Sequence, residues 1–405
     1  MNKVKLSEIA NIKMGQSPSG ETCNEVGEGV ALLNGPAEFT SSYPVPKQYT
    51  IDGKRFCNKG DILFCVRGST TGRMNWADQK YALGRGLASI SHKNGYEYNH
   101  FLKFLLYSNL NALLNAANGS TFPNLTSDIL ASFEMCVPDL KIQRSISIFL
   151  NSIDSKIELN NQINAELESM AKTLYDYWFV QYDFPNENEK PYKSSGGKMV
   201  WSEELKREIP EEWELHKLGD LGNFKNGVNY DPSNPGDVAC PIINVRNISS
   251  STYFLKNEDL DIVYLRMSDV KKYAVHNGSI IIARSGIPGA TRLIADIAEN
   301  TLYCGFAIHY ELENLDYKIP VFFYLKSIEY QIQNGSGGTI MKNVNQLTLN
   351  ALNVSLPRDK GLILAFNNLI KPIFDKISLI QNENQKLTEL RDWLLPMLMN
   401  GQVKV

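Results

Sequence analysis

The sequence predicts an α+β protein in which two mixed α/β domains stand at opposite ends of a long antiparallel two-helix coiled coil, related by an internal pseudo-two-fold repeat. Two observations support this prediction. The segment from Lys5 to about Leu174 recurs in the same order from Lys217 to about Leu394. In each copy, strand-like runs give way to apolar residues at the three- and four-residue steps of an amphipathic helix.

The repeat keeps its order while most of its residues change. Lys5-Leu6-Ser7-Glu8-Ile9 returns as Lys217-Leu218-Gly219-Asp220-Leu221, a shift of 212 residues. The later block Lys156-Ile157 returns as Lys376-Ile377, a shift of 220 residues. Because the shift drifts by only eight residues between these blocks, we expect one scaffold that carries two different binding surfaces.

Length and composition predict a folded chain of two to four domains. The chain has 405 residues, of which 43% are apolar and 21% charged. No apolar run approaches the length of a membrane helix, and the opening residues lack a signal peptide, so we expect a cytoplasmic protein. The six cysteines show no Cys-x-x-Cys spacing, which favours reduced structural thiols over disulfides or a zinc site.

The charge balance limits how the chain could bind nucleic acid. The net charge is −3; residues 1–139 carry 13 Lys+Arg against 12 Asp+Glu, and residues 201–357 carry 14 against 19. A general nucleic-acid binder would be basic. Contact with DNA would therefore need local patches, or partners that supply most of the positive charge.

Two predicted strands end in similar polar loops. The run Asp61–Val66 leads into Arg67-Gly68-Ser69-Thr70-Thr71-Gly72-Arg73, and Gly278–Ala283 leads into Arg284-Ser285-Gly286. An arginine at a strand end beside a glycine-containing loop is well placed to approach a phosphate or a base edge. The alternative is that each arginine closes a local salt bridge.

Two further loops are rich in hydrogen-bonding groups, Asn118–Asn124 and Asn334–Asn343. Such groups suit phosphate oxygens and purine edges, but Asn124 and Asn343 also precede apolar runs and could cap the next helix. The candidate DNA-binding residues are Arg67, Ser69, Thr71, Arg73, Arg85, Ser120, Asn124, Arg284, Ser285, Arg292, Thr339, Lys342 and Asn343.

The helical pattern of the first copy begins at Leu140 and continues for about 37 residues, or roughly 55 Å at about 1.5 Å per residue. Pro372 lies early in the second pattern, where it predicts a helix start or a kink and therefore a shorter second helix. The predicted coiled-coil and partner interface consists of Ile153, Ile157, Leu167, Leu174, Ile373, Ile377, Leu387 and Leu394.

Three asparagines, Asn160, Asn164 and Asn384, interrupt the apolar stripes. A polar residue in the seam of a coiled coil fixes its register at some cost in stability. The pattern equally allows these residues to lie on the solvated flank. Residues 185–200, between the copies, form a polar linker rich in glycine, proline and serine.

Motifs of catalysis are absent from the sequence. It contains no phosphate-binding Gly-x-x-x-x-Gly-Lys-[Ser/Thr] loop, no dinucleotide fingerprint and no His-Glu-x-x-His pair. Glu204-Leu205-Lys206 has the spacing seen in nucleases but lacks a suitable upstream carboxylate. We predict no catalytic residue and no metal site.

The ordered set of motifs resembles the specificity subunit of type I restriction-modification enzymes over nearly the whole chain. The most specific segments are Leu174–Pro185 and Leu390–Gly401, which follow the two helices. The repeated Lys-Leu openings, Gly60-Asp61-Ile62-Leu63 with its partner Gly278-Ser279-Ile280-Ile281, and the endings Val137-Pro138 and Leu356-Pro357 support the resemblance.

The resemblance implies two target recognition domains, residues 1–139 and 201–357, that each read one half of a bipartite asymmetric DNA site. It implies helical spacers at residues 140–184 and 358–405, which set the distance between the half-sites and bind two methyltransferase (modification) subunits. These partners would carry S-adenosylmethionine and methylate adenine, and restriction subunits would use ATP and Mg. No cofactor is expected in this chain.

Two departures from a strict repeat question whether both loops touch DNA in the same way. Ser279 stands where the first copy has Asp61, and Ala290 stands where it has Arg73. Two other classes of function stay open, a coiled-coil scaffold protein and a self-contained DNA methyltransferase or nuclease.

Overall fold

The computed structural model describes residues 2–40, 43–117, 123–231, 236–255, 260–333 and 344–403. The chain divides into two compact units, residues 1–159 with 386–405 (unit 1) and residues 160–385 (unit 2). Each unit therefore includes parts of both long helices. Within the described ranges, no helix is long and apolar enough to cross a membrane.

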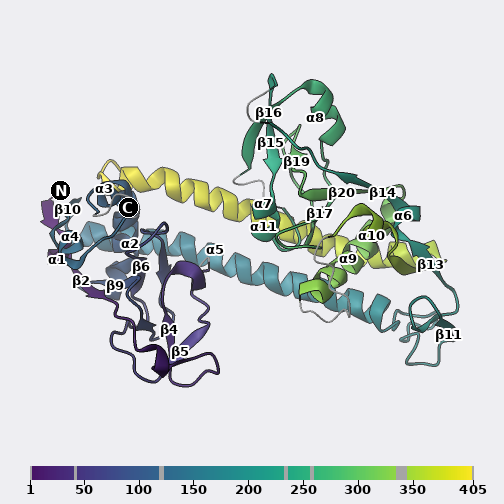
Figure 1. The fold of residues 1–405 in the computed structure, drawn as a ribbon, viewed down its shortest axis with the longest axis horizontal. Coiled ribbons are helices and arrows are strands. Elements are labelled where there is room, and N and C mark those ends of the chain that lie inside the picture. The colour runs from purple at the N-terminus through teal and green to yellow at the C-terminus, as the bar shows by residue number, and fades with distance from the viewer. Residues whose placement is uncertain are drawn as a thin grey trace. The chain divides into compact units, whose positions relative to one another are not determined.

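Unit 1 is a mixed α/β domain followed by a long helix (Figure 1). Its elements are β1 (Asn2–Lys5), α1 (Leu6–Ile9), β2 (Ala10–Met14), β3 (Cys23–Asn24), β4 (Val30–Leu33), β5 (Gln48–Thr50), β6 (Ile62–Cys65), β7 (Met74–Trp76), β8 (Ala82–Leu83), β9 (Leu87–His92), α2 (Asn99–Ser108), α3 (Leu110–Asn115), α4 (Ser127–Ser132), β10 (Glu134–Val137) and the start of α5 (Leu140–Tyr175). Its short 3-10 helices are η1 (Gly20–Thr22), η2 (Pro36–Glu38) and η3 (Tyr96–Tyr98).

Unit 2 repeats this order after a hairpin of its own. Its elements are a π-helical turn (Asp176–Val180), β11 (Met199–Ser202), β12 (Arg207–Pro210), β13 (Trp213–Lys217), α6 (Leu218–Leu221), β14 (Gly222–Asn226), β15 (Val238–Ile243), α7 (Val245–Ser249), β16 (Asp261–Leu265), α8 (Met267–Tyr273), β17 (Ile280–Ala283), β18 (Thr291–Leu293), β19 (Leu302–Tyr303), β20 (Ala307–Leu312), η5 (Leu315–Tyr317), α9 (Lys318–Gln333), α10 (Gln346–Asn350), β21 (Asn353–Pro357) and the start of α11 (Lys360–Met399).

The sheets confirm the internal repeat. Unit 1 has an antiparallel sheet in the order β2-β9-β6-β7, and unit 2 has its counterpart in the order β14-β20-β17-β18. A second sheet, β3-β5-β4-β8, corresponds to β16-β15-β19, and in both the last pair is parallel. The pair β1-β10 corresponds to β13-β21. Both predicted strands that precede the arginine-bearing loops are present, as β6 and β17.

The polar linker is folded as hydrogen-bonded turns. The Tyr192 ring stacks on Phe184 with centroids 4.7 Å apart, and the Tyr192 backbone N–H donates to the Phe184 carbonyl over 2.9 Å. The linker leads into the β11–β12 hairpin, which has no counterpart among the described residues of unit 1.

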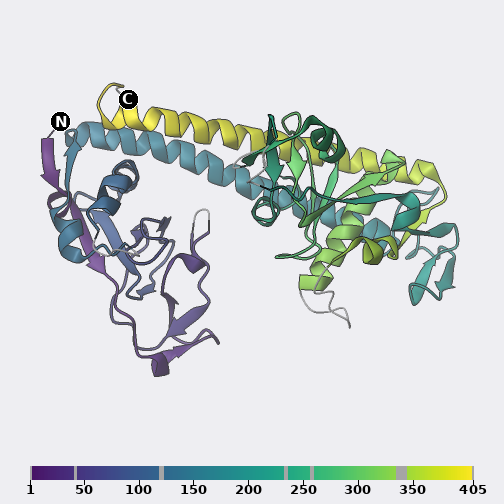
Figure 2. The same ribbon diagram turned by 45° about the horizontal axis from the view of Figure 1, so that its top comes forward.

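The two long helices run antiparallel within each unit, side by side in Figure 2. In unit 1, Arg391 of α11 pairs with Asp154 of α5 over 3.0 Å. In unit 2, Tyr175 of α5 packs against Phe366 of α11, and Asn160 bonds to Asn384. Antiparallel pairing follows because residues late in one helix meet residues early in the other.

The expected shorter second helix was wrong. Helix α11 has 40 residues and α5 has 36, and Pro372 lies inside α11. Proline removes one helical hydrogen bond. The neighbouring Ile370 and Phe374 are buried in the core of unit 2, and this packing holds the helix through the interruption.

Two of the interrupting asparagines, Asn160 and Asn384, bond to each other across the seam, and the third, Asn164, is 9% exposed. Asn160 is 1% exposed, and its Nδ2 donates to Glu383 Oε2 and to Asn384 Oδ1, each over 2.8 Å. Asn384 Nδ2 donates in turn to Asn161 over 3.0 Å. Buried amides of this kind favour one register, because a slipped helix would leave them without partners.

The predicted interface residues differ in burial. Ile153 and Ile377 are buried, and Leu167, Leu174, Ile373 and Leu394 are partly buried against the cores of their units. Ile157 and Leu387 are half-buried. Along most of their length, the apolar stripes are therefore covered by other parts of this chain.

A charged cluster fastens the globular part of unit 1 to its helices. The Asp154–Arg391 ion pair lies beside Lys103 of α2, whose ammonium stands 4.7 Å from the Trp76 ring centre. Burial lowers the pKa of Lys103, and Asp154 acts in the opposite direction. Burial also lowers the pKa of His100 to about 4, so this imidazole is neutral at pH 7. We call Lys103, Asp154 and Arg391 the charged anchor.

In unit 2, aromatic rings fasten the globular part to the long helices. Phe374, which the 220-residue shift aligns with Asp154, contacts Phe254, Phe323 and Tyr253 with ring centres 5.2, 5.8 and 6.1 Å away. Such ring pairs add roughly 0.5–1.5 kcal/mol each beyond burial of area. The globular part contacts the long helices through charged side chains in unit 1 and through aromatic rings in unit 2.

Replacing Asn160 by alanine should lower the free energy of unfolding of unit 2 by about 1–3 kcal/mol, since two hydrogen bonds are lost in a buried seam. Calorimetric unfolding measures the change. Asn151→Ala, at an exposed position of the same helix, serves as the control and should change the stability little. Equal effects of both substitutions would contradict a structural role for the seam amides.

Candidate nucleic-acid interface

Arg67 lies at the end of β6, as predicted. The strand is fully buried, whereas Arg67 and Ser69 are exposed. Gly68 and Gly72 have φ angles of 91° and 93°, which favour glycine and allow the chain to turn sharply there. The Arg67 side chain therefore stands at the rim of the sheet.

Three loops meet at this rim. The Val66 N–H donates to the Gly86 carbonyl, and the Leu125 N–H donates to the Val66 carbonyl, each over 2.9 Å. The Arg85 N–H donates to Ser17 Oγ over 3.2 Å. These bonds bring the exposed Arg85, which follows β8, to the same edge as Arg67. Arg73 is also exposed.

Asn124 is held by Arg67, whose Nε donates to Asn124 Oδ1 over 3.1 Å. The partner of this guanidinium N–H is thus a neutral amide, not the carboxylate that a local salt bridge would require. Asn124 is not a helix cap: Thr126 caps α4, and Asn345 caps α10 in unit 2. The role of Asn124 in the structure is therefore to orient the Arg67 side chain.

The prediction that Thr71 contacts DNA was wrong. It is only 9% exposed, and its hydroxyl donates to the carbonyls of Gly68 and Pro123 at 2.7 and 3.0 Å. The hydroxyl closes the loop internally and cannot present itself to DNA without breaking these bonds.

Arg284 occupies the equivalent place in unit 2, after β17. Its N–H donates to the Phe306 carbonyl over 2.9 Å, and its Nη1 donates to the Gly305 carbonyl over 3.0 Å. Arg284 and Ser285 are half-buried. One edge of the guanidinium is thus bonded to the backbone of the β19–β20 loop.

Phe306 is a surface residue that sequence reasoning missed. It lies in the loop between β19 and β20, the counterpart of the Arg85 loop, and is 63% exposed. Ala290, at the position of Arg73, is buried. Among the described residues at this edge, unit 1 presents three exposed arginines, whereas unit 2 presents one half-buried arginine and an aromatic ring.

The prediction that Arg292 contacts DNA was also wrong. It is 5% exposed, and its Nη1 bonds to both carboxylate oxygens of Glu329 over 3.1 Å. Its Nε donates to the carbonyls of Ile248 and Ser251. Lys326 adds a further bond to Glu329 over 2.6 Å. Buried charge is tolerated only when paired in this way, so Arg292 is a structural residue.

Asp61 and Ser279 have the same local role, although their residue types differ. Asp61 Oδ2 accepts from the Asn58 N–H over 2.8 Å, and Ser279 Oγ accepts from the His276 N–H over 3.0 Å. Both side chains close the turn before the buried strand. The exchange of Asp61 for Ser279 therefore affects the turn before the strand and not the exposed loop after it.

Four candidate residues, Ser120, Thr339, Lys342 and Asn343, lie outside the described residues. The same holds for most of the two polar loops in which they were predicted.

A second polar pair in each unit was also missed by the sequence reasoning. Asn34 Nδ2 donates to Gln48 Oε1 over 2.9 Å, just beyond the end of β4. In unit 2, Asp261 accepts from Asn244 over 2.8 Å and from Arg246 over 2.6 Å, just beyond the end of β15. The sequence could have indicated these residues, because Asn34 and Asn244, like Arg67, are polar residues directly after a buried strand.

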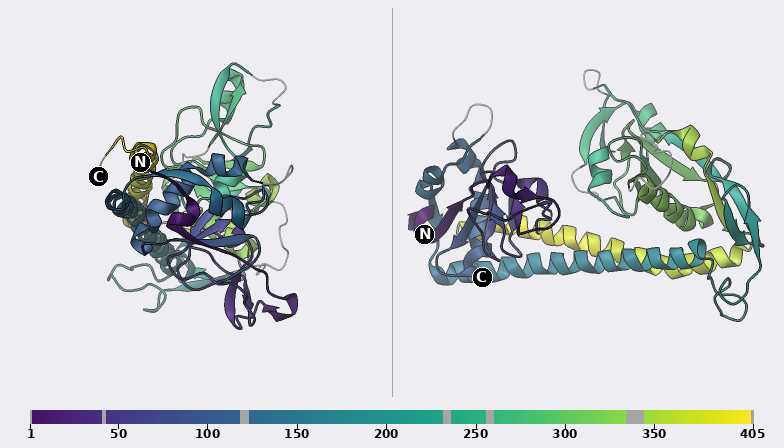
Figure 3. Two further views of the ribbon diagram at one scale, coloured as in Figure 1. Left: turned by 90° about the vertical axis from the view of Figure 1, so that its left-hand side faces the viewer. Right: turned by 60° about the horizontal axis from the view of Figure 1, so that its bottom comes forward.

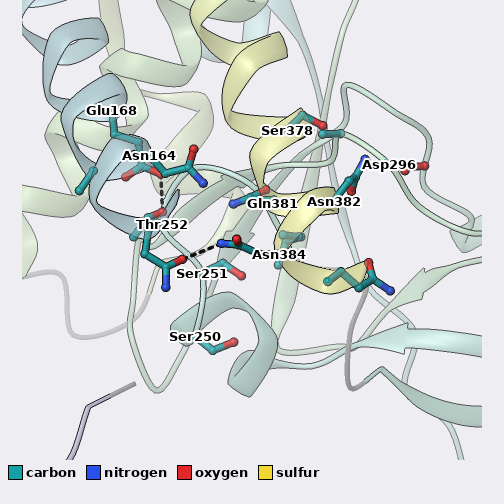
Figure 4. A pocket seen from close by; sticks show the side chains of 15 residues that line it. Asn164, Glu168, Ser250, Ser251, Thr252, Asp296, Ser378, Gln381, Asn382 and Asn384 are labelled. Atoms are coloured by element: carbon teal, nitrogen blue, oxygen red, sulfur yellow. Dashed lines mark hydrogen bonds between the residues drawn. The ribbon is translucent and has the colours of Figure 1, made fainter. Parts of the chain in front are cut away.

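A cavity of about 240 Å³ in unit 2 is lined by amides and hydroxyls of α5, α11 and the loop after α7 (Figure 4). Glu168 accepts from Thr252, and Asp296 accepts from Asn382. Burial raises the pKa of Glu168. No histidine, cysteine or lysine lines the cavity.

The described residues also bear on the expectation of no metal site and on the nuclease-like tripeptide. They contain no group of three or more His, Cys, Asp or Glu side chains that could hold a metal. In the nuclease-like tripeptide, Lys206 pairs with Glu203, and Glu204 accepts from Ser202 in the β11–β12 turn. The thiols of Cys23, Cys57, Cys65, Cys136, Cys240 and Cys304 are free.

The chain thus has a duplicated mixed α/β domain on long paired helices, with polar and arginine-bearing strand ends in each copy. The family model of the type I restriction modification DNA specificity domain matches residues 1–169 and 210–391. The chain belongs to this family. Specificity subunits are non-catalytic DNA-recognition subunits of restriction-modification complexes, so the chain is a DNA-recognition subunit and neither a scaffold nor an enzyme.

Individual relatives agree over most of the chain. The type I restriction enzyme HindI specificity subunit of Haemophilus influenzae is 25% identical, covering 86% of this chain and 88% of its own. The MjaIX specificity subunit of Methanocaldococcus jannaschii is 26% identical, covering 87% and 79%. The crystal structure of the S subunit from M. genitalium has the same fold, with a TM-score of 0.55, 17% identity and coverage of 98% and 96%.

Removing Arg67 should weaken DNA binding by the assembled complex by about 1–3 kcal/mol, as expected for an arginine that contacts a base edge. Arg67→Ala is compared with Arg67→Lys, which keeps the charge but loses the planar fork. Binding isotherms at fixed salt measure both. Arg266→Ala, at an exposed arginine outside the candidate surfaces, is the control. Equal affinity of all variants would show that Arg67 does not contact the DNA.

Proposed function

We propose that residues 1–139 and 201–357 each read one half of a bipartite, asymmetric DNA site. The observation that carries this proposal is the repeated strand-end surface, in which equivalent backbone positions hold different exposed groups. Arg67, Ser69, Arg73, Arg85 and Asn124 form the candidate surface of the first domain. Arg284 and Ser285 belong to the second.

We propose further that residues 140–184 and 358–405 dock two methyltransferase subunits and set the spacer between the half-sites, with residues 185–200 as the linker. Large apolar side chains stay exposed on both helices, which is typical of an unoccupied protein interface. They are Leu140, Ile148, Leu159, Ile163 and Met170 on α5, and Leu364, Leu369, Leu379, Leu390 and Trp393 on α11.

The partners supply the chemistry in this proposal. S-adenosylmethionine, ATP and Mg belong to the methyltransferase and restriction subunits, which act on the DNA that this chain selects. The acidic balance of residues 201–357 supports an arrangement in which the partners also supply most of the phosphate-binding charge.

Single-molecule methylome sequencing tests the assignment. A cell that expresses this chain with its methyltransferase subunit should show a split, asymmetric adenine motif, which should vanish when this chain alone is deleted. A motif that survives the deletion would show that another protein selects the site.

Lengthening both helices should lengthen the spacer and leave the half-sites unchanged. Seven residues inserted after Gln162 and after Asn382 keep the bonds from Asn160 to Glu383 and Asn384. At about 1.5 Å per residue the insertion adds roughly 10 Å, or about three base pairs at 3.4 Å each. The methylome of the variant gives the new spacer, and an unchanged spacer would refute the proposed ruler.

A further inference from the structure

We propose that a polar pair at the end of the second sheet in each unit reads a base. Asn34 with Gln48 reads adenine in one half-site. Arg246, oriented by Asp261, reads guanine in the other half-site. This inference rests on the proposed function and names side chains that carry its specificity.

The Asn34–Gln48 pair and the Asn244–Asp261 pair occupy the same place in the repeated fold, and Asp261 also accepts from Arg246. Leu32 of β4 pairs with Gln48 of β5 on one side and with Ala82 of β8 on the other. Ile242 of β15 pairs with Asp261 of β16 and with Leu302 of β19 in the same way. Gln48 and Asp261 are therefore equivalent by register, as are Asn34 and Asn244, the residues that follow the two central strands.

The place lies beside the arginine-bearing loops. A Cβ added to Gly84 would stand 2.4 Å from Asn34 Oδ1, and one added to Gly86 would stand 2.5 Å from the Asn34 carbonyl. These glycines flank Arg85, so Asn34 and Arg85 share one surface. In unit 2, a Cβ on Gly286 would stand 3.0 Å from Val245, which joins Asn244 to Arg246.

The second sheet is also the one farther from the long helices in each unit, as Figures 1 and 3 show for β4 and β5 and for β15 and β16. Side chains at its end are consequently accessible to a large ligand. Asn34 is exposed and Gln48 is half-buried, and the side chains of Arg246 and Asp261 are 56% and 52% exposed.

The Asn34–Gln48 pair matches the edge of adenine. One bond between two amides uses one donor group and one acceptor, which leaves an acceptor on one side chain and a donor on the other. Adenine presents N6–H₂ as a donor and N7 as an acceptor in the major groove. The match holds for either orientation of the amides, because each orientation leaves one group of each kind.

The unit 2 pair matches guanine through a positioned guanidinium. Asp261 accepts from Arg246 Nη2 with one oxygen and from Asn244 Nδ2 with the other, so its carboxylate is fixed from two sides. A guanidinium has five N–H donors in a rigid fork and pairs bidentately with guanine O6 and N7. Asp261 is a positioning residue here, and its own charge is compensated by Arg246.

The test is the methylome motif of the full complex with substituted chains. Asn34→Ala with Gln48→Ala should relax one adenine position in one half-site by about 5- to 150-fold, the range of a bidentate contact. The other half-site should not change. Arg246→Ala should relax one guanine position in the second half-site only, and Asp261→Asn should relax the same position less.

Matched controls are Asn58→Ala and Arg266→Ala, exposed residues of the same types and the same units, which should leave the motif unchanged. Unchanged motifs in the test variants would overturn the proposal and leave two surface contacts without a reading role. Uniform loss of methylation with unchanged base preference would make the residues phosphate contacts and would also overturn it.

The unsubstituted complex separates this proposal from the function on which it rests. A bipartite motif from that complex upholds the function, so that only the substituted chains decide the base-reading residues. Absence of any motif from it would overturn the proposed function and this inference together.

Discussion

The fold depends on mutual burial of the apolar stripes of α5 and α11. Each stripe is too long for its own globular domain to cover, so each helix needs the other. In unit 1, Ile146 and Leu150 of α5 share a core with Leu395 and Leu398 of α11. The buried amide Asn160 then selects one register, because a slip would leave polar groups unpaired where water cannot reach them.

The globular parts are fastened to the helices by different forces, although their topology is the same. Lys103, Asp154 and Arg391 form a charged anchor in unit 1, whereas Phe374 and its neighbours form an aromatic one in unit 2. An ion pair that loses one partner leaves a buried charge, while an aromatic cluster that loses a ring leaves a cavity. The two copies have therefore diverged at the contact as well as at the surface.

The strand ends show the same division between a fixed backbone and variable side chains. Close backbone contacts recur: a Cβ on Gly15 would meet the Gly84 carbonyl at 2.2 Å, and one on Gly227 would meet the Cys304 carbonyl at 2.2 Å. Between these contacts, Arg85 is exchanged for Gly305 and Phe306, and Gln48 for Asp261. DNA recognition needs this combination, since register requires a rigid support and specificity requires different edge groups.

The sequence by itself determined the duplicated α+β architecture, the strands before Arg67 and Arg284, and the family, because order and periodicity are local patterns that survive divergence. Tertiary structure alone decided the rest. Arg292 and Arg67 look alike in sequence, yet one is buried against Glu329 and the other is exposed. Pro372 predicted an interruption that packing overrode. Each of the pairs Asn34–Gln48 and Asn244–Asp261 joins a residue just after one strand to a residue on the neighbouring strand, and only the strand register brings their side chains within hydrogen-bonding distance.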